Sequence, residues 1–120
     1  MRSATTCLIL AGCLGVLPLA SAGNGWRTMG GEGDRHFVVV DASAADNTAV
    51  YQDAATALCK PARTCVVMFW NDERLAASKM PLSAAQAQSL AAQFTRSPTT
   101  GNERLLFRCR GGEPAGNCLK

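Results

Sequence analysis

The segment 59–120 contains four cysteines in two close pairs, and this feature most restricts the fold. Five residues lie between Cys59 and Cys65, and eight lie between Cys109 and Cys118. Neither spacing is that of a C-x-x-C redox motif or a paired zinc site. Four cysteines allow three connectivities, and we expect neighbours to pair because this suits the order of elements given below. Each short crosslink contributes about 2–3 kcal/mol to stability.

The first 22 residues have the pattern of a secretory signal peptide. Arg2 supplies the positive start, an almost uncharged apolar stretch covers 4–19, and the small residues of 20–22 form a cleavage site. Pro18 and two glycines interrupt the apolar stretch, which disfavours a retained membrane anchor. We therefore expect cleavage after Ala22, export to the periplasm or the medium, and no transmembrane span in the mature chain.

A second interpretation of the leader places a lipid on Cys13. The string LAGC that ends at Cys13 resembles a lipobox, and its cysteine would become the lipid-bearing first residue of an anchored lipoprotein. The apolar segment before Cys13 is short, and the residues that follow it up to Leu19 are apolar, whereas a tether is usually polar. Simple cleavage fits the leader better.

The charge of the chain excludes one class of partner. The sequence has 12 Lys and Arg against nine Asp and Glu, a formal charge of +3, and loss of Arg2 with the leader reduces it to +2. This balance is too mild for nucleic-acid binding. The glycine-rich segment 23–35 is expected to be a flexible lead-in, and 36–120 a single globular domain.

Apolar periodicity predicts five elements in this domain. Short β-branched or aromatic runs at 36–41 and 65–70 predict buried strands, and a helix capped by Asp46 or Asn47 is expected between them. Ser83 and Gln86 form a capping box before an apolar stripe, which predicts a helix over 84–95. The alternation in 104–110 predicts an edge strand. The order β-α-β-α-β favours an α/β or α+β fold with a small three-stranded parallel or mixed sheet, two flanking helices and two disulfides.

Polar residues follow the predicted strands, where open parallel sheets bind ligands. If the three strands are parallel, their carboxyl ends bring together a set of weak candidates for ligand binding: Asp41, Asn71, Asp72, Glu73 and Arg110. Three carboxylates and a guanidinium suit a cation, a polar ligand or an acid/base pair. The competing interpretation is structural, with carboxylates that cap turns and pair with Arg110. The single histidine, His36, has no second histidine with which to build a metal site, and no cofactor or metal is expected.

These observations favour a small, non-enzymatic exported domain that binds an envelope or other protein partner, as an accessory, inhibitory or immunity-type factor. Arg104, Arg108 and Arg110 alternate along the last strand, where they recruit an acidic partner or discourage edge-to-edge aggregation. One alternative is a small envelope hydrolase that uses the strand-end carboxylates, and the other is the lipoprotein anchored through Cys13. No sequence motif identifies the partner or the oligomeric state.

Overall fold

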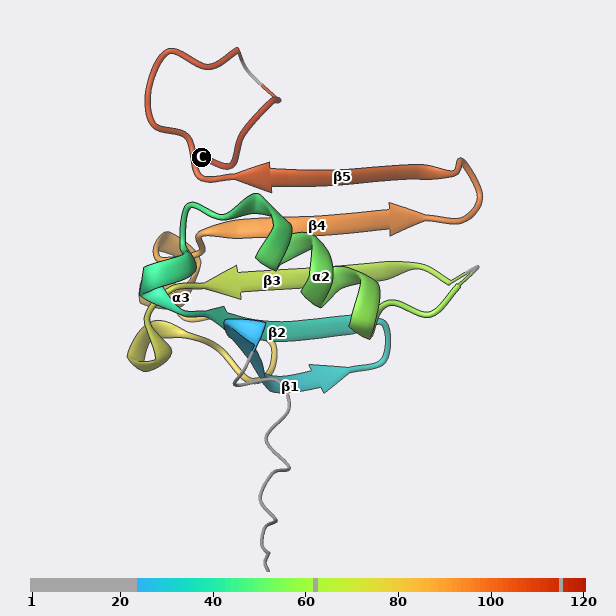
Figure 1. The fold of residues 1–120 in the computed structure, drawn as a ribbon, viewed down its shortest axis with the longest axis horizontal. Coiled ribbons are helices and arrows are strands. Elements are labelled where there is room, and N and C mark those ends of the chain that lie inside the picture. Colours follow the sequence, from blue (N-terminus) through green and yellow to red (C-terminus); the bar gives the residue numbers. More distant parts are fainter. Residues whose placement is uncertain (1–23, 62, 115) are drawn as a thin grey trace, which may run out of the picture.

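The computed structural model describes residues 24–61, 63–114 and 116–120, and it contains a five-stranded mixed sheet. The signal peptide predicted over 1–22 and the alternative lipidation site at Cys13 lie outside the described residues. The strands are β1 (Trp26–Glu32), β2 (Arg35–Val40), β3 (Cys65–Trp70), β4 (Ala92–Ser97) and β5 (Asn102–Phe107), and they lie in the sheet in sequence order (Figure 1).

Only β2 and β3 are parallel, and every other neighbouring pair is antiparallel. The β2–β3 crossover contains the helix α2 (Thr48–Leu58), which Asn47 caps by accepting a hydrogen bond from the Ala49 amide at 3.1 Å. A short 3-10 helix, η4 (Ala42–Ala44), precedes it. The long connection from β3 to β4 contains the 3-10 helix η5 (Glu73–Leu75) and the helix α3 (Ala84–Gln88).

The prediction of three strands was wrong because two strands were missed. The segment expected to be a flexible lead-in forms β1, and its glycines have specific places in the structure. A bulge interrupts the β1–β2 register between Thr28 and Gly30. The backbone carbonyl of Ser78 approaches so closely that a Cβ on Gly30 would lie 2.4 Å from it. Glycine is therefore required at position 30 by the loop packed on it.

The second missed strand is β4, which lies inside the helix predicted over 84–95. The capping box is confirmed, since Ser83 and Gln86 each accept a hydrogen bond from the other's backbone amide. The helix nevertheless ends at Gln88, and Ala92 and Phe94 point into the core from a strand that pairs with β3. Pairing with β4 satisfies the backbone groups on the second edge of the apolar strand β3, which a helix would leave unpaired.

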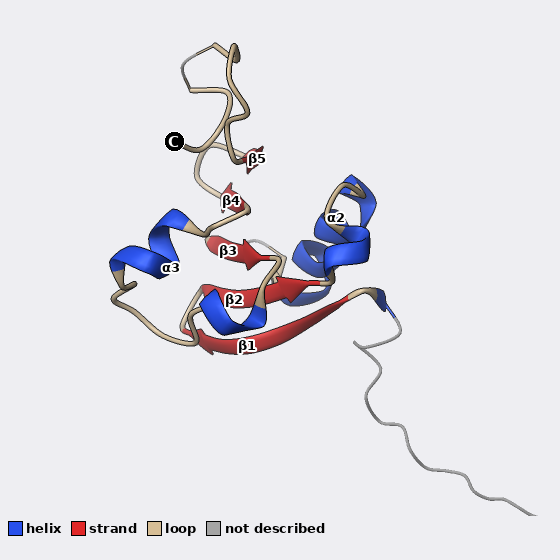
Figure 2. Cartoon of the chain, turned by 90° about the vertical axis from the view of Figure 1, so that its left-hand side faces the viewer, coloured by secondary structure: helices blue, strands red, loops and turns tan. Residues whose placement is uncertain are grey.

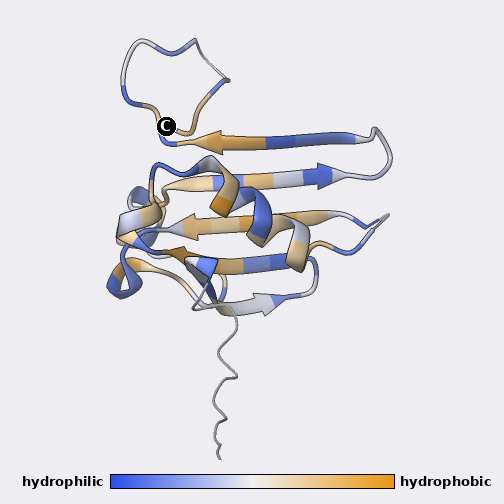
Figure 3. Ribbon diagram, in the orientation of Figure 1, coloured by the Kyte–Doolittle hydropathy of each residue, from blue (hydrophilic) through white to orange (hydrophobic). Residues whose placement is uncertain are grey.

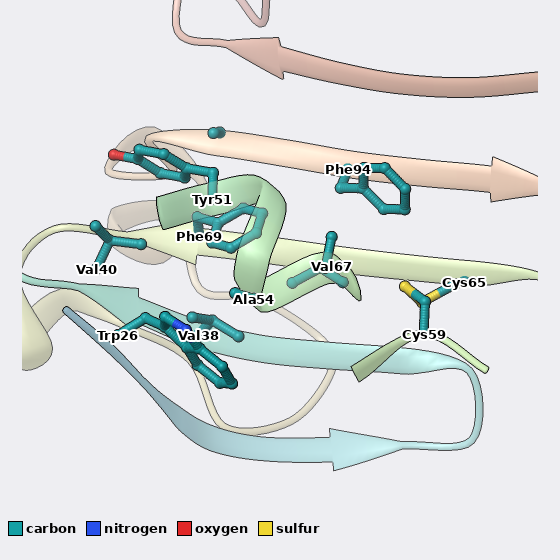
Figure 4. Packing of buried hydrophobic residues seen from close by; sticks show 12 residues of the cluster. Trp26, Val38, Val40, Tyr51, Ala54, Cys59, Cys65, Val67, Phe69 and Phe94 are labelled. Carbon is teal, nitrogen blue, oxygen red and sulfur yellow. A yellow bond between two sulfur atoms is a disulfide. The ribbon is translucent and has the colours of Figure 1, made fainter. Parts of the chain in front are cut away.

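The helices α2 and α3 lie on opposite sides of the sheet (Figure 2), and each side has its own apolar cluster. Under α2, Phe69, Val67 and Tyr51 pack with Trp26 and Phe94 (Figure 4). On the other side, Phe37, Val39, Met68, Trp70 and Ala77 form a second, smaller cluster. Phe37, Phe69 and Trp70 are fully buried, which agrees with the prediction that the runs forming β2 and β3 are buried strands.

Both disulfides join sequence neighbours, as expected. Cys59 is bonded to Cys65, which connects the end of α2 to the start of β3, and Cys109 is bonded to Cys118 in the C-terminal loop. This small globular domain is therefore crosslinked twice, which is compatible with an exported protein. Among the residues that the structure describes, no helix has the length and apolar character needed to cross a bilayer.

Candidate functional site

The strands β2, β3 and β5 run in the same direction, because β2 and β3 are parallel and β4 is antiparallel to both of its neighbours. The carboxyl ends of these three strands therefore lie at one edge of the sheet. All five candidate binding residues lie at this edge, on the segments that follow these strands. They divide into two groups that face different surroundings. Asp41, Asp72 and Glu73 pair with nearby arginines, and Asn71 and Arg110 line a groove.

Arg27 of β1 forms ion pairs with two of the three carboxylates. One of its guanidinium nitrogens lies 3.6 Å from Asp41 Oδ1, and another donates to Glu73 Oε1. Sequence reasoning missed Arg27 because its strand was not predicted. The register of β1 places Arg27 opposite Val39, next to the end of β2, and this brings the guanidinium to Asp41.

Asp72 has a local structural role at the start of η5. Its carboxylate accepts a hydrogen bond from the Arg74 backbone amide at 2.9 Å and two more from the Arg74 guanidinium at 3.2 and 3.0 Å. The hydrogen bonds from Arg74 lower the pKa of Asp72 below its usual value. Asp72 is therefore an ionised helix cap.

Asn71 connects β3 to the buried side of α2. Its amide donates to the Val40 carbonyl at 3.3 Å and to Tyr51 Oη at 3.0 Å, and Tyr51 Oη donates to the Ala45 carbonyl at 2.8 Å. Burial raises the pKa of Tyr51, and the hydrogen bond from Asn71 lowers it by a smaller amount. This chain of hydrogen bonds fixes the segment before α2 against the end of the sheet.

Arg110 lies just beyond β5 and reaches the segment before α2. Its guanidinium lies 3.1 Å from Asp46 Oδ1, and its backbone amide donates to the carboxylate of Glu113 at 3.1 and 3.2 Å. The hydrogen bond from this amide lowers the pKa of Glu113. Arg110 and Asp46 are both largely exposed, and both line the groove.

Two adjoining cavities of about 410 and 310 Å³ form this groove, which we name the α2–β5 groove. Both are lined by Asp46 and Arg110, together with Phe107 and Arg108 of the β5 segment. Tyr51 and Asn71 line the smaller cavity, and Thr48 and Cys118 line the larger one. The groove therefore lies between α2, the end of β5 and the second disulfide.

Arg108 fixes the inner wall of the groove. Its guanidinium donates to the carbonyl of Leu90 at 2.9 Å and to that of Ala87 at 2.8 Å, which joins the end of β5 to the segment that leaves α3. Sequence reasoning placed Arg108 on a basic stripe but did not assign it to the site. Phe107, Tyr51 and Asp46 were also missed, because the groove forms only when α2 packs beside β5.

No cluster of three or more His, Cys, Asp and Glu side chains suited to a metal ion occurs in 24–61, 63–114 and 116–120. His36 lies in β2 near the start of that strand, at the opposite edge of the sheet from the groove. The groove instead combines an aromatic floor with arginine, carboxylate and amide groups. This composition suits recognition of a polar or amphipathic surface.

The described residues form a small mixed-sheet domain with two disulfides and a groove between α2 and β5. No protein-family model matches the chain, and neither the curated proteins nor the solved structures include a significant match.

Proposed function

We propose that this protein is a small exported domain that binds another protein of the cell envelope or its surroundings, as an accessory, inhibitory or immunity-type factor. The observation that most supports this proposal is the α2–β5 groove, which is open to solvent at the carboxyl edge of the sheet. Its arginines lie beside an aromatic floor, and aromatic and arginine side chains are enriched where proteins bind one another.

The groove is built on fixed elements, which favours binding. Arg108 is held by two backbone carbonyls, and Tyr51 is held between Asn71 and Ala45. A partner that enters the groove would therefore meet side chains already ordered in the free protein. Less conformational entropy is lost on binding to an ordered surface.

The ion pairs at the same edge weaken the case for a hydrolase. Asp41 and Glu73 both contact Arg27, and the pKa of Asp72 is lowered. A general acid at neutral pH needs the opposite shift, a raised pKa that keeps a proton on the carboxyl group. We therefore do not retain the carboxylate hydrolase as a second candidate.

A bulky side chain in the groove tests the proposal. Thr48 is an exposed residue of α2 that lines the larger cavity, whereas Ala57 is exposed on the same helix and lines neither cavity of the groove. Immobilised wild-type protein, Thr48→Trp and Ala57→Trp are incubated with envelope and medium fractions of the producing cells. We expect one protein to be retained equally by wild type and Ala57→Trp and at least about tenfold less by Thr48→Trp. Equal retention by all three variants contradicts binding in the groove.

A further inference from the structure

The outer edge of β5 has backbone groups that point away from the sheet in a defined register. The amide of Arg108 donates to the Ala91 carbonyl, on the β4 side. The carbonyl of Phe107 faces the other way and accepts from the Leu119 amide. Because these directions alternate along an antiparallel strand, the amides and carbonyls of Glu103 and Leu105 also point outward.

The C-terminal tail covers only the end of this edge. Leu119 bonds to Phe107 and Cys109, but the amide of Asn117, two residues earlier, donates to the Pro114 carbonyl instead. Within the part of the chain that the structure describes, the outward backbone groups of Glu103 and Leu105 have no backbone partner. Figure 1 shows this part of β5 at the margin of the sheet, beyond β4.

A second copy of the chain does not fit this edge. Since outward groups occur at every second residue, two β5 edges related by a two-fold axis must place one residue opposite its own copy. Centring the pair on Glu103 or Arg104 places like charges directly opposite, which is destabilising. Centring it on Leu105 places Glu103 opposite Phe107, whose carbonyl already accepts from Leu119.

The charge on this edge is complementary to an acidic segment. Arg104 is exposed, and its guanidinium donates to the Gly116 carbonyl at 2.6 Å. No carboxylate of a described residue lies within ion-pair distance of it. Figure 3 shows that β5 is hydrophilic in its first half and hydrophobic in its second half. On the α2 side, Leu105 lines a cavity of about 350 Å³ together with Phe94.

We propose that β5 binds an extended segment of the partner as an added antiparallel strand, with an acidic residue opposite Arg104. This inference rests on the proposed binding function and names the chemistry of the partner. The backbone of the segment bonds to Glu103 and Leu105, and its acidic side chain faces Arg104 in a non-hydrogen-bonded pair, where side chains approach most closely. Its alternate apolar side chains cover Leu105 and enter the cavity beside Phe94.

Two synthetic peptides test the added strand directly. They are capped Ser-Thr-Val-Asp-Val-Thr-Ser and the same peptide with Lys in place of Asp. We expect the aspartate peptide to bind wild-type protein about tenfold more tightly than the lysine peptide at low salt. It should also slow hydrogen exchange of the Glu103 and Leu105 amides. The Arg104→Glu variant should reverse the preference. Binding of neither peptide, or equal binding of both, overturns the proposal.

A pair of proline variants tests the direction of the backbone groups. Leu105→Pro removes an outward amide and leaves pairing with β4 intact, so it should stay folded and lose peptide binding at least tenfold. Leu106→Pro removes an amide that points to β4 and should lower the melting temperature more than Leu105→Pro does. Peptide binding by folded Leu105→Pro overturns strand addition. If the partner captured through Thr48 also binds Leu105→Pro normally, the groove proposal stands and the added strand alone is wrong.

Discussion

The two disulfides lie in regions of opposite character. Cys59 and Cys65 are buried, and they hold α2 against the strand at the centre of the sheet. Cys109 and Cys118 are only partly buried, and they close a C-terminal loop beyond the edge strand β5. The same sequence signal, two cysteines close together, therefore secures a core in one region and shapes the wall of a groove in the other. The difference between the core region and the C-terminal region can be measured.

Substitution of Phe69 and of Phe107 should give the largest difference in stability between the two regions. Both rings contact the Tyr51 ring edge to face, at centroid distances of 5.0 and 4.9 Å. Phe69 is fully buried in β3, whereas Phe107 is half-buried. We expect Phe69→Ala to lower the free energy of unfolding by about 3–5 kcal/mol and Phe107→Ala by about half as much. Urea unfolding measures both values, and equal losses would show that β5 belongs to the core.

Removal of each disulfide should also affect the stability of the two regions differently. Replacing Cys59 and Cys65 with Ala should lower the free energy of global unfolding by about 2–3 kcal/mol. Replacing Cys109 and Cys118 should lower it by less than about 1 kcal/mol, which is below the value expected from loop length alone, because the C-terminal loop opens locally while the sheet stays folded. In the second variant the Cys109 and Leu119 amides should exchange faster. A large loss of global stability there would contradict the comparison.

Tyr51 connects the two regions, and its titration should be visible in the stability. The neutral phenol is favoured in the folded protein because burial raises its pKa above the usual value of 10.0. This contribution is complete below pH 10 and is lost as the pH rises toward the folded pKa. Tyr51→Phe should cost about 1 kcal/mol at neutral pH through its lost hydrogen bonds. The variant should also lose less stability than wild type between pH 9 and about 11 in urea titrations. Parallel pH curves for the two proteins would contradict this role.

Removal of the surface ion pairs should change the free energy of unfolding least. Arg27 is 38% exposed and contacts two carboxylates, whereas Arg110 is 76% exposed and contacts one. We expect Arg27→Gln to lower the free energy of unfolding by less than about 1 kcal/mol and Arg110→Gln by less again. Thermal unfolding at low and high salt measures both, and the loss should shrink as salt is added.

Local patterns in the sequence predicted the elements whose signals agree with each other. The apolar runs of β2 and β3, the capping box of α3 and the pairing of neighbouring cysteines are all present in the structure. The strand β4 was missed because Phe94 fits two patterns. It continues a helical stripe from Ala87, and it also alternates with Gln93 and Thr95. The segment forms a strand because β3 needs a second partner strand. This requirement depends on the arrangement of the whole sheet and is not visible in the local sequence.

The candidate site was predictable only where it depends on topology. The assumption that the predicted strands are parallel placed Asn71 and Arg110 at one edge of the sheet, and they lie there because β2, β3 and β5 share a direction. The division of the five residues into two groups depends on Arg27. Its strand, β1, was not predicted because the segment is rich in glycine. The groove further depends on how α2 packs against Phe107, a contact between segments far apart in the chain.

The sequence order of the strands in the sheet has a consequence for folding. Each strand pairs with the one synthesised just before it, and each disulfide joins consecutive cysteines of 59–120. A chain threaded through a membrane pore with its N-terminus first would therefore meet every pairing partner already on the far side. Among the cysteines of 59–120, Cys59 is the one that precedes Cys65, and Cys109 is the thiol still free when Cys118 emerges if the first pair has already been oxidised. An oxidant acting in order of emergence then produces the native crosslinks, and no reshuffling by an isomerase is needed.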